Sequence, residues 1–213
     1  MIGYVTLASL AGIASILGTG LAFGLLGKAH RNSRIIVNAH LDVIRSWVRG
    51  PEGDGQGWRA NQITLLHRLE WLNPSHVIFP LASGPGLIQM TAGDKLTLGG
   101  DLVRAIVMLN QNITSFNATL GKVESFRVAH AAALSRVHVE ATRRLMARGD
   151  DATLPTFETL VAESPMDAND VHLTSALINL LIGLHAGLIG CPGSNGLCAS
   201  YHATRAAYER DSI

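Results

Sequence analysis

The first hydrophobic stretch of the chain runs from Gly3 to Gly27 and contains no charged side chain. A basic cluster follows it directly, made of Lys28, His30, Arg31 and Arg34. The hydrocarbon core of a bilayer is about 30 Å thick, and a helix crosses it with roughly 20 apolar residues. The pattern therefore predicts a transmembrane anchor over residues 1–27.

A cleaved secretory signal is the alternative interpretation of this segment. Such signals begin with positive charges, continue through roughly 7–15 apolar residues and end at a small-residue cleavage site. Here no Lys or Arg precedes the apolar run, the run is longer than that, and the positive charges follow it. We therefore expect a retained anchor.

The asymmetry of charge around this segment also predicts its orientation. Lys and Arg near the ends of a span stay on the cytoplasmic side, and Arg45 and Arg49 add to the cluster on the C-terminal side. We expect a single-pass protein of the inner (plasma) membrane, with its N-terminus outside and residues 28–213 in the cytoplasm. Arg greatly outnumbers Lys, which favours a bacterial source with a GC-rich genome.

Small residues recur one helical turn apart inside the predicted span, as Ala14 with Gly18 and Gly20 with Gly24. Such pairs allow the backbone of a second membrane helix to approach closely. The alternative is that glycine and alanine are simply frequent in membrane helices. Both interpretations of these four residues stay open.

The helical pattern continues past the anchor into residues 28–49. An apolar stripe at steps of three and four consists of Val37, Leu41, Ile44 and Val48, and no proline occurs before the Gly/Pro-rich segment 50–55. We expect one helix of about 45 residues, roughly 70 Å long, with half in lipid and half projecting into water.

Residues 50–213 are expected to form one helical soluble domain. A helix is predicted from about Trp58 to Leu72, followed by an irregular insert over 73–100 that is rich in Pro and Gly. The insert contains short apolar runs, including Leu87–Met90, which fit either short strands or an ordered loop laid over the bundle. A loop of this length is uncommon without a role, so we expect a contact surface there.

The strongest periodic pattern of the domain lies between Leu102 and Arg148. Its apolar positions alternate in steps of four and three, which predicts a coiled-coil-like seam: Leu102, Ile106, Leu109, Ile113, Phe116, Leu120, Val123, Leu134, Val137, Ala141 and Leu145. Arg127 and His130 interrupt it. We expect one very long helix, with Asp101 as its N-cap, and keep a hairpin at the interruption as the alternative.

Three further helices are predicted towards the C-terminus, at about Thr156–Ala162, Val171–Gly190 and Ser200–Arg210. The middle one carries no formal charge after its cap and is long enough to cross a membrane. Its polar residues, among them Asn179 and His185, would be costly in lipid, so we expect a buried core helix, with a second span as the alternative.

Composition agrees with an all-α fold in which an N-terminal transmembrane helix extends into a helical bundle. Aromatic residues make up 5% of the 213 residues, and small and aliphatic side chains dominate, which favours helix packing over a sheet. The net charge of +1 gives no basis for nucleic-acid binding. About 180 residues remain beyond the anchor, which is enough for one domain with a real core.

Candidate chemistry is sparse along the chain. Recognised motifs for acyl transfer, phosphate binding, zinc proteolysis and dinucleotide binding are missing from the sequence, so we expect no enzyme and no catalytic residues. Cys191 and Cys198 lie in and beside a Pro/Gly/Asn loop without the further ligands of a zinc site. They are expected to be reduced thiols in the cytoplasm, or a disulfide if the domain lies outside.

His130 and His185 are the candidates for holding a haem or pigment, because histidines on facing bundle helices ligate such groups. Their surroundings lack the ligand spacing of a metal site, so we expect neither a cofactor nor a metal.

These features together favour a non-catalytic accessory subunit of a larger membrane complex, for example a photosynthetic, respiratory or secretion complex. The expected partners are the lipid bilayer and other membrane-protein subunits, with no nucleic acid and no small-molecule substrate. A signalling bundle that dimerises through the Leu102–Leu145 seam is the first alternative, and the His-ligated haem or pigment carrier is the second.

Overall fold

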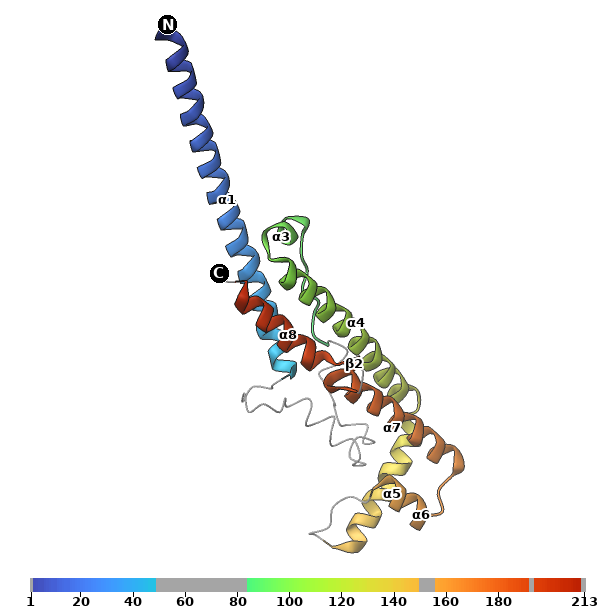
Figure 1. The fold of residues 1–213 in the computed structure, drawn as a ribbon. Helices are drawn as coiled ribbons and strands as arrows, with labels where there is room; N and C mark the ends of the chain where they lie inside the picture. Colours follow the sequence, from blue (N-terminus) through green and yellow to red (C-terminus); the bar gives the residue numbers. More distant parts are fainter. Residues whose placement is uncertain (1, 49–83, 150–155, 192–193, 212–213) are drawn as a thin grey trace.

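A computed structural model describes residues 2–48, 84–149, 156–191 and 194–211 of the chain. The described part is all-α, apart from a two-residue antiparallel hairpin between β1 (Gly190–Cys191) and β2 (Ser194–Asn195). Figure 1 shows an elongated molecule in which the N-terminal helix extends beyond the rest at one end. The helices are α1 (Ile2–Val48), α3 (Ala92–Thr97), α4 (Gly100–Ala129), α5 (Ala131–Arg148), α6 (Phe157–Glu163), α7 (Ala168–Ile189) and α8 (Leu197–Arg210).

The single long N-terminal helix is confirmed as α1, which runs unbroken from Ile2 to Val48. The predicted stripe of its second half is buried along its whole length: Val37, Leu41, Ile44 and Val48. This half of α1 packs against α8 and α3 (Figure 1). By contrast, the residues from Ala22 to Ala29 are exposed. The helix therefore has one end built into the domain and one end that projects from it.

The predicted helix Trp58–Leu72 and the first part of the irregular insert lie outside the described residues. The rest of the insert is an extended loop on α4, followed by α3. Asn110 of α4 holds this loop, because its side-chain amide accepts a hydrogen bond from the backbone N–H of Ile88 (2.9 Å) and donates one to the Ile88 carbonyl (2.8 Å). Around Leu87–Met90, the ordered loop is therefore confirmed and the strand alternative is wrong.

Helix α4 is the central element of the domain. The predicted seam positions that fall on it are all buried, and they face mainly α7 and α8: Leu102, Ile106, Leu109, Ile113, Phe116, Leu120 and Val123. Its first turn contains Asp101, but the N-cap is Gly99, two residues earlier than predicted. The seam residues on α4 are thus part of the core of a single chain.

The expectation of a single helix from Leu102 to Arg148 is wrong, and so is the hairpin. The chain leaves helical geometry at His130 (φ −118°, ψ 21°), where α4 ends and α5 begins. Figure 1 shows α5 continuing away from the end of α4 at an angle. The physical reason lies in the missing seam turn at Arg127 and His130, since no apolar side chain there holds the helix straight against α7. Beyond the bend, α5 packs on α7 through Leu134, Val137 and neighbouring alanines.

Helix α7 runs antiparallel to α4 and also contacts α5 (Figure 1). Among the described residues it is the one helix long and apolar enough to cross a membrane by length and composition, so the predicted N-terminal span is not shown by this criterion and stays a prediction. One of its faces is buried in the domain, through Leu177, Leu181, Leu184 and Leu188. Its N-cap is Asp167, because that carboxylate accepts hydrogen bonds from the backbone N–H groups of Asn169 and Asp170. However, 28% of its most apolar window is buried and Ile182 and Ile189 are exposed, so the core-helix interpretation and a second span both stay open.

The last helix, α8, begins three residues before the predicted start. Gly196 makes this start possible, because a Cβ atom on it would lie 2.3 Å from the backbone nitrogen of Gly190 and 2.5 Å from the carbonyl carbon of Ile189. The hairpin can therefore close tightly between α7 and α8. This closure brings α8 back along α4 and α1, towards the exposed half of α1 (Figure 1).

Candidate functional site at the anchor junction

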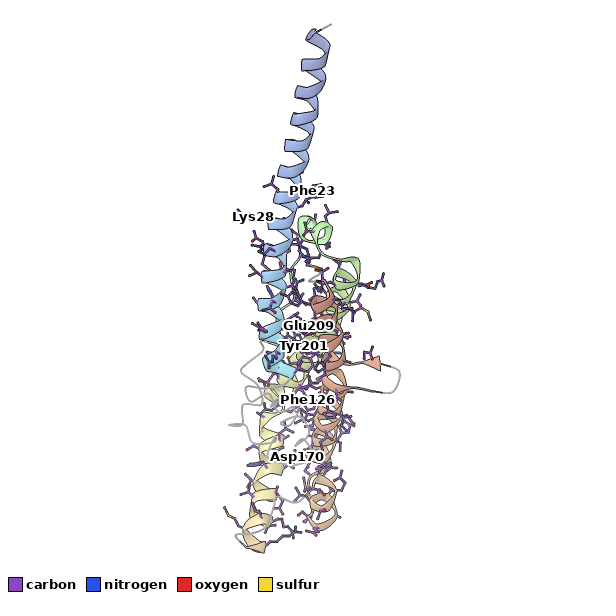
Figure 2. The ribbon with its side chains drawn as sticks, turned by 60° about the vertical axis from the view of Figure 1, so that its left-hand side comes forward. Phe23, Lys28, Phe126, Asp170, Tyr201 and Glu209 are labelled. Carbon is purple, nitrogen blue, oxygen red and sulfur yellow. The ribbon has the colours of Figure 1, made fainter. Side chains whose placement is uncertain are left out.

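The most densely bonded polar contact between distant parts of the described chain lies where α1 enters the domain. We call it the anchor junction, and it joins three elements: His30, Ser33 and Arg34 of α1, Asp94 and Thr97 of α3, and Tyr208 of α8 with Asp211 directly after it. Figure 2 shows this region below the exposed residues Phe23 and Lys28. The junction decides how the projecting helix is held.

Ser33 connects α1 to α3. Its hydroxyl is buried, and its one proton is shared between the Asp94 carboxylate and the carbonyl of Ala29. The hydroxyl of Thr97 lies 3.3 Å away. The hydrogen bond from Ser33, with further ones from Thr91, holds the pKa of Asp94 below its ordinary value. Asp94 also completes the capping box with Thr91 that starts α3. One carboxylate therefore both forms this short helix and docks it.

His30 connects α1 to both other elements. Its Nδ1 donates a hydrogen bond to the Thr97 carbonyl at 2.8 Å, since a carbonyl oxygen only accepts. Its Nε2 lies 3.9 Å from a carboxylate oxygen of Asp211. The other oxygen of Asp211 accepts a hydrogen bond from the backbone N–H of Gly99, at 2.7 Å. The end of α8 and the start of α4 are thereby held beside α1.

Arg34 lies over the ring of Tyr208, with its guanidinium carbon 4.3 Å from the ring centre, a cation–π contact. Arg205 of α8 continues the connection, because it donates a hydrogen bond to the side chain of Asn38 at 2.8 Å. The predicted basic cluster therefore has two parts. Lys28 and Arg31 are exposed, whereas His30 and Arg34 are half-buried and contact α3 and α8.

The sequence pattern did not predict a polar site at this junction. A local signal was present, because Ser33 stands four residues before Val37, in phase with the buried stripe. A polar residue in the phase of a buried stripe indicates a polar partner across the interface. The partners themselves, Asp94 and Thr97, are more than 60 residues away, and no periodicity connects them.

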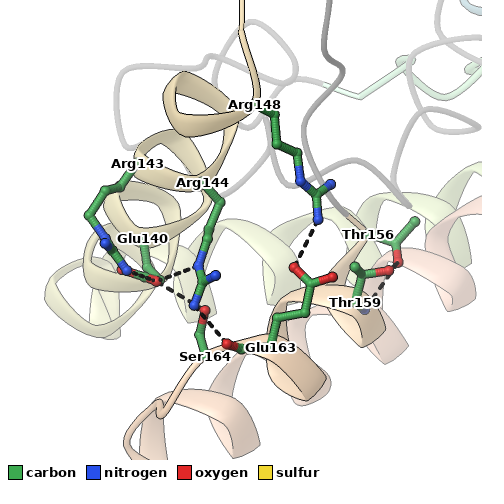
Figure 3. Close-up of polar contacts among 8 residues, drawn as sticks. All are labelled: Glu140, Arg143, Arg144, Arg148, Thr156, Thr159, Glu163 and Ser164. Atoms are coloured by element: carbon green, nitrogen blue, oxygen red, sulfur yellow. Dashed lines mark hydrogen bonds and ion pairs between the residues drawn. The ribbon is translucent and has the colours of Figure 1, made fainter.

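A second polar cluster lies at the opposite end of the molecule and joins α5 to α6 (Figure 3). Glu140 accepts hydrogen bonds from Arg143, Arg144 and the hydroxyl of Ser164, and these contacts, led by Arg143, lower its pKa to about 2. Arg144 also donates to the carbonyl of Glu163 at 2.6 Å. The cluster fastens the short α6 to α5, so we assign it a structural role.

A third contact joins α5 to the first turn of α7. Arg136 donates two hydrogen bonds to the Asp170 carboxylate, at 2.7 and 2.6 Å. Asp170 is buried, and the guanidinium beside it holds the pKa of its carboxyl below the ordinary value. This bidentate pair sets the position of α5 after the bend at His130.

The structure does not bring the two candidate histidines together. Asp170 lies beside Arg136, and Gly187 lies near Phe116, so the antiparallel register places His130 opposite residues near 175. That is roughly ten residues, or about 15 Å, from His185 along α7. Each histidine is half-buried. The ring of His130 packs on Phe126 with centres 4.4 Å apart, and Nε2 of His185 has no hydrogen-bond partner among the described residues.

Only some of the remaining predicted site residues, the two cysteines and the small residues of α1, lie in the described part of the structure. Cys198 is a free, half-buried thiol, and burial raises its pKa to about 11. The side chain of Cys191 lies outside the described part, so the disulfide stays a prediction. A Cβ atom on Gly24 would face open space, which leaves that position free for a neighbouring helix. The surroundings of Ala14, Gly18 and Gly20 lie outside the described part.

Within the described residues, no group of three or more His, Cys, Asp and Glu side chains is placed to hold a metal ion. Comparison with protein-family models, with curated proteins and with solved structures gives no match for this chain. Any functional conclusion must therefore come from the chain's own geometry. The described structure is that of an all-α protein with a projecting apolar helix and a polar junction at the base of that helix.

Proposed function

We propose that this chain is a non-catalytic accessory subunit that anchors and stabilises a larger membrane protein complex, for example a photosynthetic, respiratory or secretion complex. The observation that carries the proposal is the continuity of α1, which passes without a break from the apolar segment into the core of the domain. A flexible tether would need a linker between anchor and domain, and α1 has none.

The exposed side chains before the junction support the membrane part of the proposal. Phe23, Leu25 and Leu26 point away from the domain, and an apolar helix surface without protein cover is stable in lipid or against another membrane helix. The open position at Gly24 fits a neighbouring helix. The exposed Lys28 and Arg31 favour the orientation in which the domain is cytoplasmic.

The anchor junction supports the structural part. Hydrogen bonds and a cation–π contact from three elements converge on one helical turn of α1, and the apolar stripe adds packing below it. A domain held in this way keeps a defined direction relative to the membrane. Such a fixed direction is useful to a subunit that must meet several partners at once.

The signalling alternative loses its proposed route to dimers. The seam residues on α4, including Leu109, are buried against α7 and α8 of the same chain, so they are not available to a second copy. The carrier alternative cannot use His130 and His185 together as a pair of ligands, since the two lie far apart. An absorption spectrum after expression with haem and pigments present tests that alternative, and we expect no visible band.

The proposal is tested by deleting the gene and examining the membrane complexes of the host on native gels. We expect one complex to be lost or reduced, and to be restored by the full chain but not by a chain without residues 2–27. The full chain should also migrate with partners in mild detergent, well above its own 22.6 kDa. A chain that migrates alone, in a strain whose complexes are all intact after deletion, would refute the subunit function.

A further inference from the structure

Helix α3 is the part of the helical domain that lies nearest to the predicted membrane. Figures 1 and 2 both show it beside α1, close to the level of Lys28, with the rest of the domain extending in the opposite direction. The contacts from His30 to Thr97 and from Ser33 to Asp94 hold it there. Its height relative to α1 is therefore set by the anchor junction.

This height matches the headgroup layer of a bilayer. The contacts to α3 come from residues two to five positions after Lys28, which corresponds to about 3–8 Å along the helix axis. A bilayer has about 30 Å of hydrocarbon within a total of about 40–45 Å, which leaves about 5–7 Å of headgroups on each side. With residues 1–27 spanning the hydrocarbon, α3 lies at the depth of the headgroups.

The outward face of α3 has the chemistry of that layer. Asp94 and Thr97 point towards α1, while Leu96, about half a turn away, is 86% exposed, the highest value for any large apolar side chain in the described residues. A fully exposed leucine is unfavourable in water and gains from an apolar environment. Leu25 and Leu26 of α1, on the membrane side of the junction, are exposed apolar side chains as well.

Positive charges accompany this leucine. Lys95, Lys28 and Arg31 are all exposed near the same level. Asp94 keeps its negative charge, because its partners Ser33 and Thr91 are neutral, but its carboxylate faces α1. Asp101 pairs with Arg104 at 3.7 Å, so the three exposed cations still leave an excess of positive charge. Lysine and arginine close to a membrane surface are attracted to anionic lipid headgroups.

We infer that α3 binds the surface of the membrane, with Leu96 inserted between headgroups and Lys95, Lys28 and Arg31 placed on anionic phospholipids. The inference rests on the proposed membrane anchor and adds a second point of membrane contact to it. Two contacts, one through the span and one through α3, prevent the domain from swinging about α1. They fix both the tilt and the rotation at which it meets its partners.

Spin labels on the full chain in lipid vesicles test this inference. In a background with Cys191→Ser and Cys198→Ala, single cysteines replace Leu96, Leu25 or Met146, which are all exposed, so a label disturbs no core packing. Collisions with oxygen, which concentrates in lipid, are compared with collisions with a water-soluble nickel complex. Met146 is the matched control, because it is 77% exposed and lies near the end of α5, far from α3 (Figure 1).

In vesicles of phosphatidylcholine with phosphatidylglycerol, we expect the label at Leu96 to lose collisions with nickel relative to Met146, with a value between those at Met146 and Leu25. In phosphatidylcholine alone, this protection should decrease, and unchanged protection would overturn the role of the basic residues. A lipid-like label at Leu25 with a water-like label at Leu96 would overturn the inference and leave the anchor intact. Water-like labels at both positions would refute the anchor as well.

Discussion

Replacing Leu41 with alanine tests whether the second half of α1 belongs to the core of the domain. Leu41 is 0% exposed and lies in the middle of the stripe that packs on α8. Truncation of a fully buried leucine costs about 2–5 kcal/mol, because the transfer free energy is lost and a cavity remains. The matched control is Ile35→Ala on the same helix, at a position that is 61% exposed. Surface substitutions of this kind change stability by about 0.5 kcal/mol or less.

The two variants are compared by thermal unfolding in detergent, followed by circular dichroism. For a chain of this size, each kcal/mol shifts the midpoint by about 2–4 °C, so Leu41→Ala should lower it by roughly 4–20 °C. Ile35→Ala should leave it nearly unchanged. Equal midpoints for the two variants would show that α1 is not packed in the core, and the rigid coupling between anchor and domain would be refuted.

Three further predictions follow from single sites. The pKa of Glu140 is about 2 in the fold and about 4.5 without its partners, so its contribution to stability is complete above pH 4.5 and is lost as the pH falls towards 2. Glu140→Gln should therefore flatten the fall of the unfolding midpoint between pH 5 and pH 3, and an unchanged slope would contradict the assignment. Gly196→Ala should lower the free energy of unfolding by about 1–3 kcal/mol, because the new Cβ meets the backbone of Gly190. The control Gly121→Ala, which faces open space on α4, should raise the free energy of unfolding by about 0.5–1 kcal/mol. Equal unfolding midpoints for the two variants would contradict the close approach at Gly196. The thiol of Cys198 should react with alkylating reagents at pH 8 about a hundredfold more slowly in the fold than after denaturation, since its pKa is raised to about 11, and equal rates would show that it is not buried.

The periodicity of apolar residues predicted the helices that bury one face in the core. The stripe from Val37 to Val48 and the seam from Leu102 to Val123 were recognisable because a helix repeats every 3.6 residues and one side of it meets the core. The helices α6 and α8 were also found, with starts that differ by one to three residues. Their boundaries depend on caps and close approaches, such as that of Gly196, which periodicity does not contain.

The bend at His130 and the anchor junction depend on contacts between distant residues. The sequence shows that the seam is interrupted at Arg127 and His130. The direction of α5 after the interruption depends on α7 and on the Arg136–Asp170 pair, which the sequence pattern does not show. At the junction, a buried serine in the stripe was the only local sign. In the sequence, His30 and Arg34 were part of the basic cluster after the predicted span, because nothing nearby showed that Thr97 and Tyr208 would be their partners.

The orientation of the proposed anchor would decide the compartment of the domain, the state of its cysteines and the side on which partners are met. Fusion of reporters to Ile213 measures it most directly, with alkaline phosphatase active only outside the cytoplasm and a fluorescent protein active only inside. Since Lys28 and Arg31 are exposed beside the end of the apolar segment, the account predicts strong fluorescence and silent phosphatase. Strong phosphatase activity with no fluorescence would contradict it, and would place the domain on the outer face of the membrane.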